Sequence, residues 1–509
     1  MSRLPALLLA SLAFVVLLAG CRHDARDANT VNFLIENSPA SLDPRVGTDV
    51  SSEHIDELIF DSLVHKRADF GLEPWLATSW QTPDPLTFIF HLRTDIKFHN
   101  GQPLTARDVK YTLDSVRDGT VITAKAGTFR TIDRVDAPDA ATVIVHLKQP
   151  DASLLWNLSD GAIGIVPYGS GRDFQQHPIG SGPFRFVSQQ IDKEVVLERN
   201  PATWQTVPHI DRVRFSVVPD AITRALELRK GSADVAVNAL TADMVYSLRD
   251  DPNLVIQIAP GTPVQYVTFN VTDPILKDAR VRRAIALAID REAIIHALWR
   301  DTAQPAYGLL PPGHWAEADA GSANSFDPAQ SRALLDAAGY HPGKNGVRFH
   351  VTLKSSTDES TRLLAAILQQ QLKQVGIALD IRSFEFATFY ADVTHGAFQM
   401  YALRWVGGNE DPDIFRYAFA SSSFPPKGAN RGHYVNATLD NLVQQAGESY
   451  DQSARRADYV QVQRILAQDL PSLPLWYLDT VVVHRRRLTG VEASRSGTFD
   501  FLRTAVLLP

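Results

Sequence analysis

The sequence lacks most of the features that would assign it to a class at once. It contains one cysteine, Cys21, in 509 residues, which excludes a disulfide within the chain. Its basic residues form no long run: the densest group is Arg485-Arg486-Arg487, and the net charge is −7. Nucleic acid is therefore not an expected partner. Beyond residue 20, no apolar stretch approaches the roughly 18 residues that span a bilayer, so the remaining chain is not expected to cross one.

The motifs of common enzyme classes are also missing. There is no serine in a Gly-x-Ser-x-Gly turn, no His-Glu-x-x-His pair and no Cys/His group with metal-binding spacing. Residues 339–345 resemble a phosphate-binding loop but are one residue too short, and Asn345 replaces the magnesium-binding Ser/Thr. Glu410, Asp411 and Asp413 could bind a hard cation, but helix capping and polar ligand contacts are favoured. We expect no catalysis, cofactor or metal; the alternative is a hydrolase whose paired carboxylates come from distant segments.

The first 29 residues have the pattern of an export signal followed by a tether. Arg3 supplies a positive charge, residues 7–18 form an apolar run too short for a convincing spanning helix, and Leu18-Ala19-Gly20-Cys21 follows at once. This pattern resembles a bacterial lipobox. It predicts a lipoprotein signal peptide over 1–20, lipidation of Cys21 and a tether over 21–29. The alternatives are an ordinary signal peptide with a coincidental cysteine, or an uncleaved anchor.

The rest of the chain alternates short β-rich runs with amphipathic helices. Thr105 with Asp108 predicts one capped helix start and Asp290 another, and an apolar stripe over 364–375 predicts a helix ended by Gly376. Strands are predicted at residues 31–35, 88–92, 142–147, 195–197, 212–217, 266–270, 349–353 and 378–381. The class is therefore α/β with some antiparallel sheet, and the length predicts two or three domains. The Pro/Gly-rich joints are candidate hinges or lobe edges, at 178–183, 309–313 and 421–428.

Several motifs follow one another in a fixed order over the whole mature length. They include Ser41-Leu42-Asp43-Pro44, Leu72-Glu73-Pro74-Trp75-Leu76-Ala77, Lys97-Phe98-His99-Asn100-Gly101, Gly180-Ser181-Gly182-Pro183-Phe184, Val281-Arg282-Arg283-Ala284-Ile285 and Asp469-Leu470-Pro471-Ser472-Leu473-Pro474. Each motif alone is weak, but together they resemble the peptide/nickel-type family of extracellular solute-binding proteins, family 5.

The resemblance implies a periplasmic-binding-protein-like class II fold, with two hinged lobes and an extra inserted domain. By analogy, residues 30–72, 178–284 and 485–509 form the first lobe, residues 73–177 the inserted domain, and residues 285–484 the last lobe. Such folds close on a ligand held between the lobes, and a permease can distinguish the closed form.

The same resemblance implies the function and the partners. We expect a monomeric substrate-binding component of an ABC importer that captures peptides or peptide-like solutes and delivers them to permease and ATPase subunits. It would work in the periplasmic space, lipid-anchored to a bacterial membrane, inner or outer. The alternatives are a receptor for a non-peptide solute, such as a sugar or chelated metal, and a secreted chaperone or signalling receptor that reuses the fold. Ligand identity and affinity stay open.

The best candidate for a ligand-binding segment is 401–415, the ligand-contacting loop in the resembled family. The predicted ligand-binding residues are Tyr401, Arg404, Trp405, Gly408, Asn409, Glu410 and Asp411. Arg404 suits bidentate pairing with a carboxylate. Peptide-binding relatives carry an aspartate for the peptide ammonium where this chain has Gly408. Either Asn409 or Glu410 replaces it, or the ligand lacks a free ammonium at that point.

Overall fold

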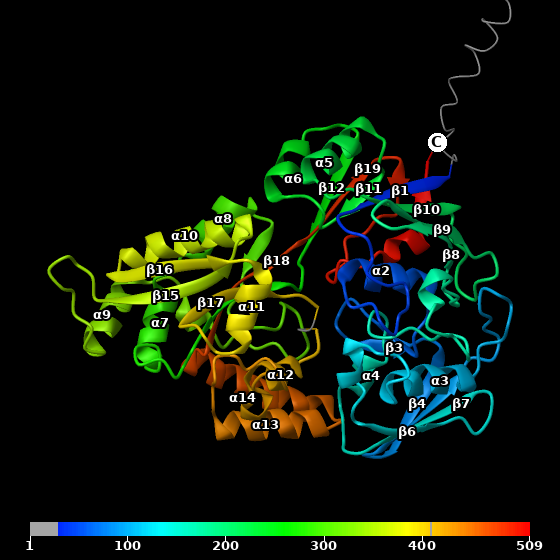
Figure 1. The fold of residues 1–509 in the computed structure, drawn as a ribbon, viewed down its shortest axis with the longest axis horizontal. Helices are drawn as coiled ribbons and strands as arrows, with labels where there is room; N and C mark the ends of the chain where they lie inside the picture. Colours follow the sequence, from blue (N-terminus) through cyan, green and yellow to red (C-terminus); the bar gives the residue numbers. More distant parts are fainter. Residues whose placement is uncertain (1–28, 408–409, 509) are drawn as a thin grey trace, which may run out of the picture.

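The structure, a computed structural model, describes residues 29–407 and 410–508. Two large bodies lie side by side, and a smaller one lies against the right-hand body in Figure 1. We call the body on the seven-stranded sheet lobe I, the body on the six-stranded sheet lobe II, and the body on the four-stranded sheet the inserted domain. No helix in the described part of the chain has both the length and the apolar character needed to cross a membrane.

Lobe I is a mixed sheet whose central strand pairs in parallel with both neighbours. The strand order is β12 (Leu254–Ala259), β19 (Thr480–Arg485), β11 (Val235–Val237), β1 (Thr30–Ile35), β10 (Arg212–Val217), β9 (Glu194–Arg199) and β8 (Phe184–Gln190). Its helices are α2 (Val50–Ile59), α5 (Ala221–Lys230) and α6 (Ala242–Leu248), and the short elements η2 (Phe174–Gln176), η5 (Asp500–Arg503), β20 (Leu488–Thr489) and β21 (Val506–Leu507) lie nearby. The core on the α2 side includes Val31, Phe33, Ile55 and Phe215, all fully buried.

Lobe II is a second mixed sheet with helices on both faces. The strand order is β14 (Ala303–Pro305), β18 (Ser472–Leu478), β13 (Val264–Phe269), β17 (Met400–Trp405), β15 (Phe349–Ser356) and β16 (Ile377–Phe384). One core draws on α7 (Ala279–Leu287), α8 (Arg291–Trp299), α9 (Pro328–Ala337) and α10 (Glu359–Lys373). Further cores use α11 (Phe386–Thr394), α12 (Ile414–Phe419), α13 (Ala437–Glu448) and α14 (Gln452–Asp469); η3 (Ser322–Asn324) and η4 (Ser421–Ser423) are short turns.

The inserted domain is an antiparallel sheet with one long helix. Its strands are β4 (Ala77–Asp84), β5 (Thr87–Leu92), β7 (Thr142–Leu147) and β6 (Ile132–Asp136), and α3 (Ala106–Arg117) packs on them. The hairpin of β2 (Val64–Lys66) and β3 (Leu72–Pro74), helix α4 (Leu154–Asn157) and turn η1 (Ala124–Gly127) contribute side chains to the core of this domain.

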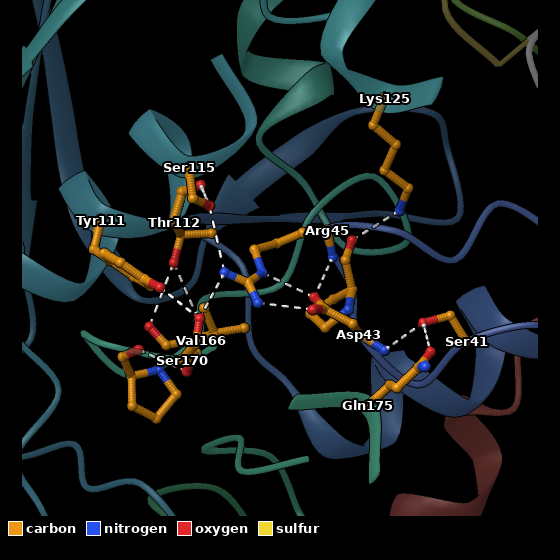
Figure 2. Close-up of polar contacts among 12 residues, drawn as sticks. Ser41, Asp43, Arg45, Tyr111, Thr112, Ser115, Lys125, Val166, Ser170 and Gln175 are labelled. Carbon is orange, nitrogen blue, oxygen red and sulfur yellow. Dashed lines mark hydrogen bonds and ion pairs between the residues drawn. The ribbon is translucent and has the colours of Figure 1, made fainter. Parts of the chain in front are cut away.

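Arg45 forms a buried ion pair within its own segment and also contacts the inserted domain (Figure 2). Arg45 is fully buried, and its Nε and Nη2 donate to the two oxygens of Asp43 at 2.9 and 2.7 Å. Its Nη1 donates to the Ser115 hydroxyl of α3 and to the Ser170 carbonyl, both at 3.4 Å. The bidentate geometry makes this a strong, directional contact. The pair fixes the Arg45 guanidinium, and the Nη1 contact with Ser115 joins this segment to α3.

Local sequence signals predicted many elements correctly. The predicted strands 142–147 and 212–217 coincide with β7 and β10. The Thr105 amide donates to the Asp108 carboxylate at 2.8 Å at the start of α3, and Asp290 accepts from the Ala293 amide at the start of α8. These signals act over three residues, so they need no knowledge of the tertiary fold.

The crossing points between the lobes differ from the sequence prediction, which assigned 178–284 to the first lobe and 285–484 to the last. Strand β13 and helix α7 belong to lobe II, while β19 belongs to lobe I. The chain therefore crosses at 260–263 and at 479. Both crossings join strands of similar apolar character, so the local pattern does not reveal which sheet receives each strand. The boundaries of the inserted region, 73–177, stay a prediction.

The two crossings pack directly on each other. Ala259 pairs with Thr480 in one sheet and Val264 with Tyr477 in the other, so the two segments run antiparallel between the lobes. The Leu478 amide donates to the Pro263 carbonyl at 2.9 Å. A Cβ added at Gly261 would overlap the Leu478 carbonyl oxygen and lie 3.1 Å from the Thr480 nitrogen. Glycine is thus required for this close approach, and the paired crossings form the hinge.

We predict that Gly261→Ala destabilises the protein by about 1–3 kcal/mol, because the added methyl group forces the two crossings apart. Urea unfolding monitored by circular dichroism measures the change. Gly171→Ala is the matched control, since nothing lies within 4 Å of a Cβ at that exposed position. Equal unfolding free energies for the two variants would contradict the close packing at the hinge.

Candidate functional site

Segment 410–411 lies at the junction of lobe II with the β2–β3 hairpin and the inserted domain. Glu410 Oε2 is 3.7 Å from the Nζ of Lys66 on β2. The Ser153 hydroxyl donates to Asp411 Oδ1 at 3.0 Å, and the Ala152 amide donates to the Gly447 carbonyl at 2.8 Å. Residues from both sides of the molecule therefore bond here, and the predicted segment forms part of the interface.

Glu410 is buried and held from several directions. The Thr262 hydroxyl donates to its Oε1 at 3.2 Å, and His314 Nε2 lies 3.0 Å from its backbone oxygen. Burial lowers the pKa of His314 to about 4, so the imidazole is neutral at pH 7 and its Nε2–H donates to that oxygen. His314 Nδ1 then accepts from the Ala316 amide at 3.0 Å.

The charge of Lys66 is maintained by the carboxylates around it. Burial alone would lower the pKa of Lys66, but the nearby carboxylates, first Glu410 and then Asp160, hold that pKa above its usual value. The Lys66 ammonium therefore stays charged, and its ion pair with Glu410 joins the β2–β3 hairpin to lobe II. In this arrangement the Glu410 carboxylate is bound to a lysine of the protein itself.

Strand β17 separates two residues that the sequence analysis treated as one site. Successive residues of a strand point to opposite faces. Tyr401 and Trp405 join one core, where the Trp405 ring stacks on Tyr266 with centroids 5.6 Å apart. Arg404 lies on the other face, with its Cζ 5.8 Å from the centroid of the Trp299 ring. The structure thus brings Tyr401 and Trp405 together and points Arg404 away from them.

Arg431 was missed by the sequence analysis and lies beside Trp405. It is buried, its Nη2 donates to the Tyr390 hydroxyl at 2.9 Å, and its Cζ lies 5.7 Å from the Trp405 ring centroid. Tyr266, Tyr401, Trp405 and Arg431 all line one small cavity. Its lining comes from segments far apart in sequence, and no local motif marks Arg431.

Three of the residues predicted from the sequence lie outside the described part of the chain: Cys21, Gly408 and Asn409.

The predicted acidic group does not converge on one point. Glu410 pairs with Lys66, Asp411 accepts from Ser153, and Asp413 pairs with Arg416. Another group, His65, Asp160 and Asp500, has ligand atoms within 4.8 Å of one another. Its carboxylates already accept hydrogen bonds: Arg503 Nε donates to Asp500 at 2.8 Å, and the Lys66 amide donates to Asp160 at 2.8 Å. These contacts favour a structural role for both groups.

Comparisons of sequence and of fold both relate the chain to one group of proteins. The family model described as "Bacterial extracellular solute-binding proteins, family 5 Middle" matches residues 71–425. The chain is 28% identical over 511 residues to di/tripeptide-binding protein 1 of Pseudomonas aeruginosa (strain UCBPP-PA14), covering 94% of both proteins.

Two solved structures illustrate the shared fold. The ABC transporter-associated periplasmic binding protein DppA from Helicobacter pylori, in complex with the peptide STSA, is 26% identical with a TM-score of 0.77, covering 94% of this chain and 98% of that one. NikZ from Campylobacter jejuni, in complex with Ni(L-His), is 24% identical with a TM-score of 0.79, covering 94% of this chain and 99% of that one. The two-lobed class II fold with an inserted domain, expected from the sequence, is confirmed.

We predict that Lys66 and Glu410 are energetically coupled. Replacing either one, as Lys66→Met or Glu410→Gln, should cost roughly 1–3 kcal/mol because the remaining charge loses its ion-pair partner. The double variant should be more stable than the sum of the two losses implies, by at least about 1 kcal/mol. Urea unfolding of the four proteins measures this difference.

The exposed pair Arg67–Asp69 is the matched control for this cycle, with N–O distance 2.6 Å and side chains about half exposed. The cycle of Arg67→Met and Asp69→Asn should give a coupling below about 1 kcal/mol, because solvent screens the pair. Strictly additive losses at Lys66 and Glu410 would mean that the two charges do not interact across the junction.

Proposed function

Because the chain belongs to family 5 of the bacterial extracellular solute-binding proteins, we propose that it captures short peptides between lobe I and lobe II for an ABC importer. The observation that carries the proposal is the junction itself. Lobe II reaches the other side of the molecule through the hinge and through polar contacts such as Lys66–Glu410. A solute that contacts both sides adds to these contacts and shifts the lobes towards the closed arrangement.

The lobe II side of the junction suits a peptide. Trp405 is half-buried beside the exposed Tyr417, with ring centroids 6.2 Å apart, and Tyr390 and Phe386 are exposed and stacked on each other at 5.8 Å. Flat aromatic faces of this kind pack against apolar side chains and peptide planes. The Arg431 guanidinium behind Trp405 adds a positive charge that suits a peptide carboxylate. The peptide-bound relative and the di/tripeptide-binding relative support the same class of ligand.

The proposal includes a lipid anchor at Cys21 and a place on the outer side of a bacterial inner membrane or in the periplasm at the outer membrane. The support is the lipobox-like sequence before Cys21 and the absence of any other cysteine. The protein is proposed to act as a monomer with permease and ATPase subunits, and to release its ligand chemically unchanged.

Calorimetry with a panel of di- and tripeptides tests the proposed function. At least one peptide should bind wild-type protein, and Trp405→Leu should weaken that binding by about 30-fold, as expected for loss of an aromatic anchor. Arg404→Gln is the matched control: its side chain leaves β17 on the other face, so we expect affinity within about threefold of wild type. Binding that depends on Arg404 but not on Trp405 would place the ligand on the wrong face of the sheet, and a panel without any binder would end the peptide proposal.

A second prediction concerns the anchor. Full-length protein expressed in a bacterial host should enter the detergent-rich phase of a Triton X-114 partition, because acyl chains contribute about 0.8 kcal/mol for each buried methylene. Cys21→Ser should move the protein into the aqueous phase. Wild-type protein that stays in the aqueous phase would contradict lipidation.

A further inference from the structure

Helix α2 of lobe I presents three carboxyl groups on one face. Glu53, Asp56 and Glu57 have the spacing i, i+3 and i+4, which aligns side chains along a helix. All three line one cavity, and Asp160 approaches the same cavity from the segment after α4. The remaining lining residues are Pro44, Phe60, Ser62, Lys125, Gly161 and Gly164.

Two of these carboxyls are buried with an oxygen that has no hydrogen bond. Asp56 is 5% exposed and Glu57 is 7% exposed. Within the described residues, Asp56 Oδ1 and Glu57 Oε2 have no hydrogen-bond partner. A buried polar atom without a partner costs free energy, and an unpaired buried charge costs more. The two oxygens therefore offer unused acceptor capacity at the cavity wall.

The nearby lysines do not supply the missing partner. The Lys125 ammonium donates to the carbonyl oxygens of Pro44, at 3.0 Å (Figure 2), and of Ala162, at 2.9 Å. Lys66 pairs with Glu410 on lobe II. Among the described residues, no ion pair joins either lysine to Asp56 or Glu57. Both cations are held by the scaffold, while the α2 carboxyls face the cavity.

One wall of the cavity, at Gly161, lies close to the lysine that contacts lobe II. A Cβ placed at Gly161, whose φ is +73°, would lie 2.7 Å from Glu57 Oε1 and 3.7 Å from Lys66 Nζ. Glycine at this position keeps open the space between the α2 carboxyls and the lysine that contacts lobe II.

We propose that the carboxyls of Asp56 and Glu57 bind a primary ammonium group of the captured solute. This proposal rests on the proposed function, because the ammonium belongs to a ligand held at the junction. The free space accepts a group about the size of one water molecule, which suits an ammonium better than a planar guanidinium. The ammonium is either the peptide's α-amine or the amine of a lysine-like side chain.

Protonation supports the assignment. Burial is the largest cause that raises the pKa of Asp56 and Glu57 well above their ordinary values of 3.8 and 4.5. Neighbouring carboxylates add to the rise, and Lys125 at Asp56 and Lys66 at Glu57 oppose it without cancelling it. The charged groups that act on the pair are Asp43, Asp49, Glu53, Lys66, Lys125, Asp160 and Asp500. An arriving ammonium stabilises the ionised carboxyls, so binding should release protons.

The raised pKa values also fix the sign of the pH dependence. Carboxyls whose pKa is higher in the folded state stabilise the protein below their ordinary values, and this contribution is lost as the pH rises through the folded-state values. Asp56→Asn and Glu57→Gln remove the group that must ionise. The double variant should therefore be at least as thermally stable as wild type at pH 8. A melting curve at that pH also checks that the double variant folds.

Calorimetry with Ala-Lys-Ala and its two mono-acetylated forms tests the proposal. One acetylated form should bind wild-type protein at least about tenfold more weakly than the unmodified peptide. Loss on α-acetylation assigns the site to the α-amine, and loss on ε-acetylation assigns it to the side chain. Asp56→Asn/Glu57→Gln should bind all three peptides with affinities within about threefold, whereas the exposed control Asp250→Asn should keep the wild-type preference. Discrimination that survives in the double variant, or equal binding of all three peptides to wild type, overturns the proposal.

Methylammonium separates this proposal from the peptide function. At 100 mM it should raise the melting temperature of wild-type protein more than tetramethylammonium does, and the difference should vanish in the double variant. If no peptide binds but this specific effect occurs, the peptide function fails and the cation site stands. If peptides bind but neither methylammonium nor acetylation discriminates between wild type and the double variant, the cation site fails and the peptide function stands.

Discussion

Two short segments carry the chain between lobe I and lobe II, and every interaction across the junction depends on how they pack. They run antiparallel, with Gly261 against the Leu478 carbonyl, so they behave as one narrow joint. A joint of this kind permits rotation of the lobes but allows little sliding of one segment along the other. The approach of Glu410 to Lys66 is then set mainly by the angle between the lobes. A modest rotation can therefore make or break this partly buried ion pair, so the closed form gains an attraction that the open form lacks.

Short-range sequence patterns predicted the elements well because their causes are local. The capping of α3 by Asp108 and of α8 by Asp290 depends on residues three positions apart. The family resemblance predicted the two lobes, the hinge and the inserted domain, which the comparisons confirm. The assignment of β13 and β19 to their sheets was not predictable from pattern, since an apolar strand fits either sheet and only the complete topology selects one.

The candidate site was predictable only in part, and the errors have physical causes. Residues 404 and 405 are neighbours in sequence, and strand alternation alone could have separated them once β17 was recognised. The sequence left open whether Glu410 replaces the missing ammonium-binding aspartate. Its pairing with Lys66 could not be predicted, because Lys66 lies on a hairpin more than 300 residues away in sequence. No local motif marks Arg431 or the α2 carboxyls. Arg431 stands out because it is buried beside Trp405, and the carboxyls stand out because each is buried with an oxygen that has no hydrogen bond.

The charges at the junction divide into those that hold the scaffold and those left for a ligand. Arg45 is bound to Asp43, Lys125 to backbone carbonyls, and Lys66 to Glu410. Among the described residues, none of these cations forms an ion pair with Asp56 or Glu57, although the carboxyls lie in the same part of lobe I. Rotating Lys66 towards Glu57 would release Glu410 and weaken the closed arrangement. A ligand ammonium avoids this conflict, because it supplies the positive charge to α2 while Lys66 continues to hold lobe II. Closure and ligand recognition can then strengthen each other rather than compete for one lysine.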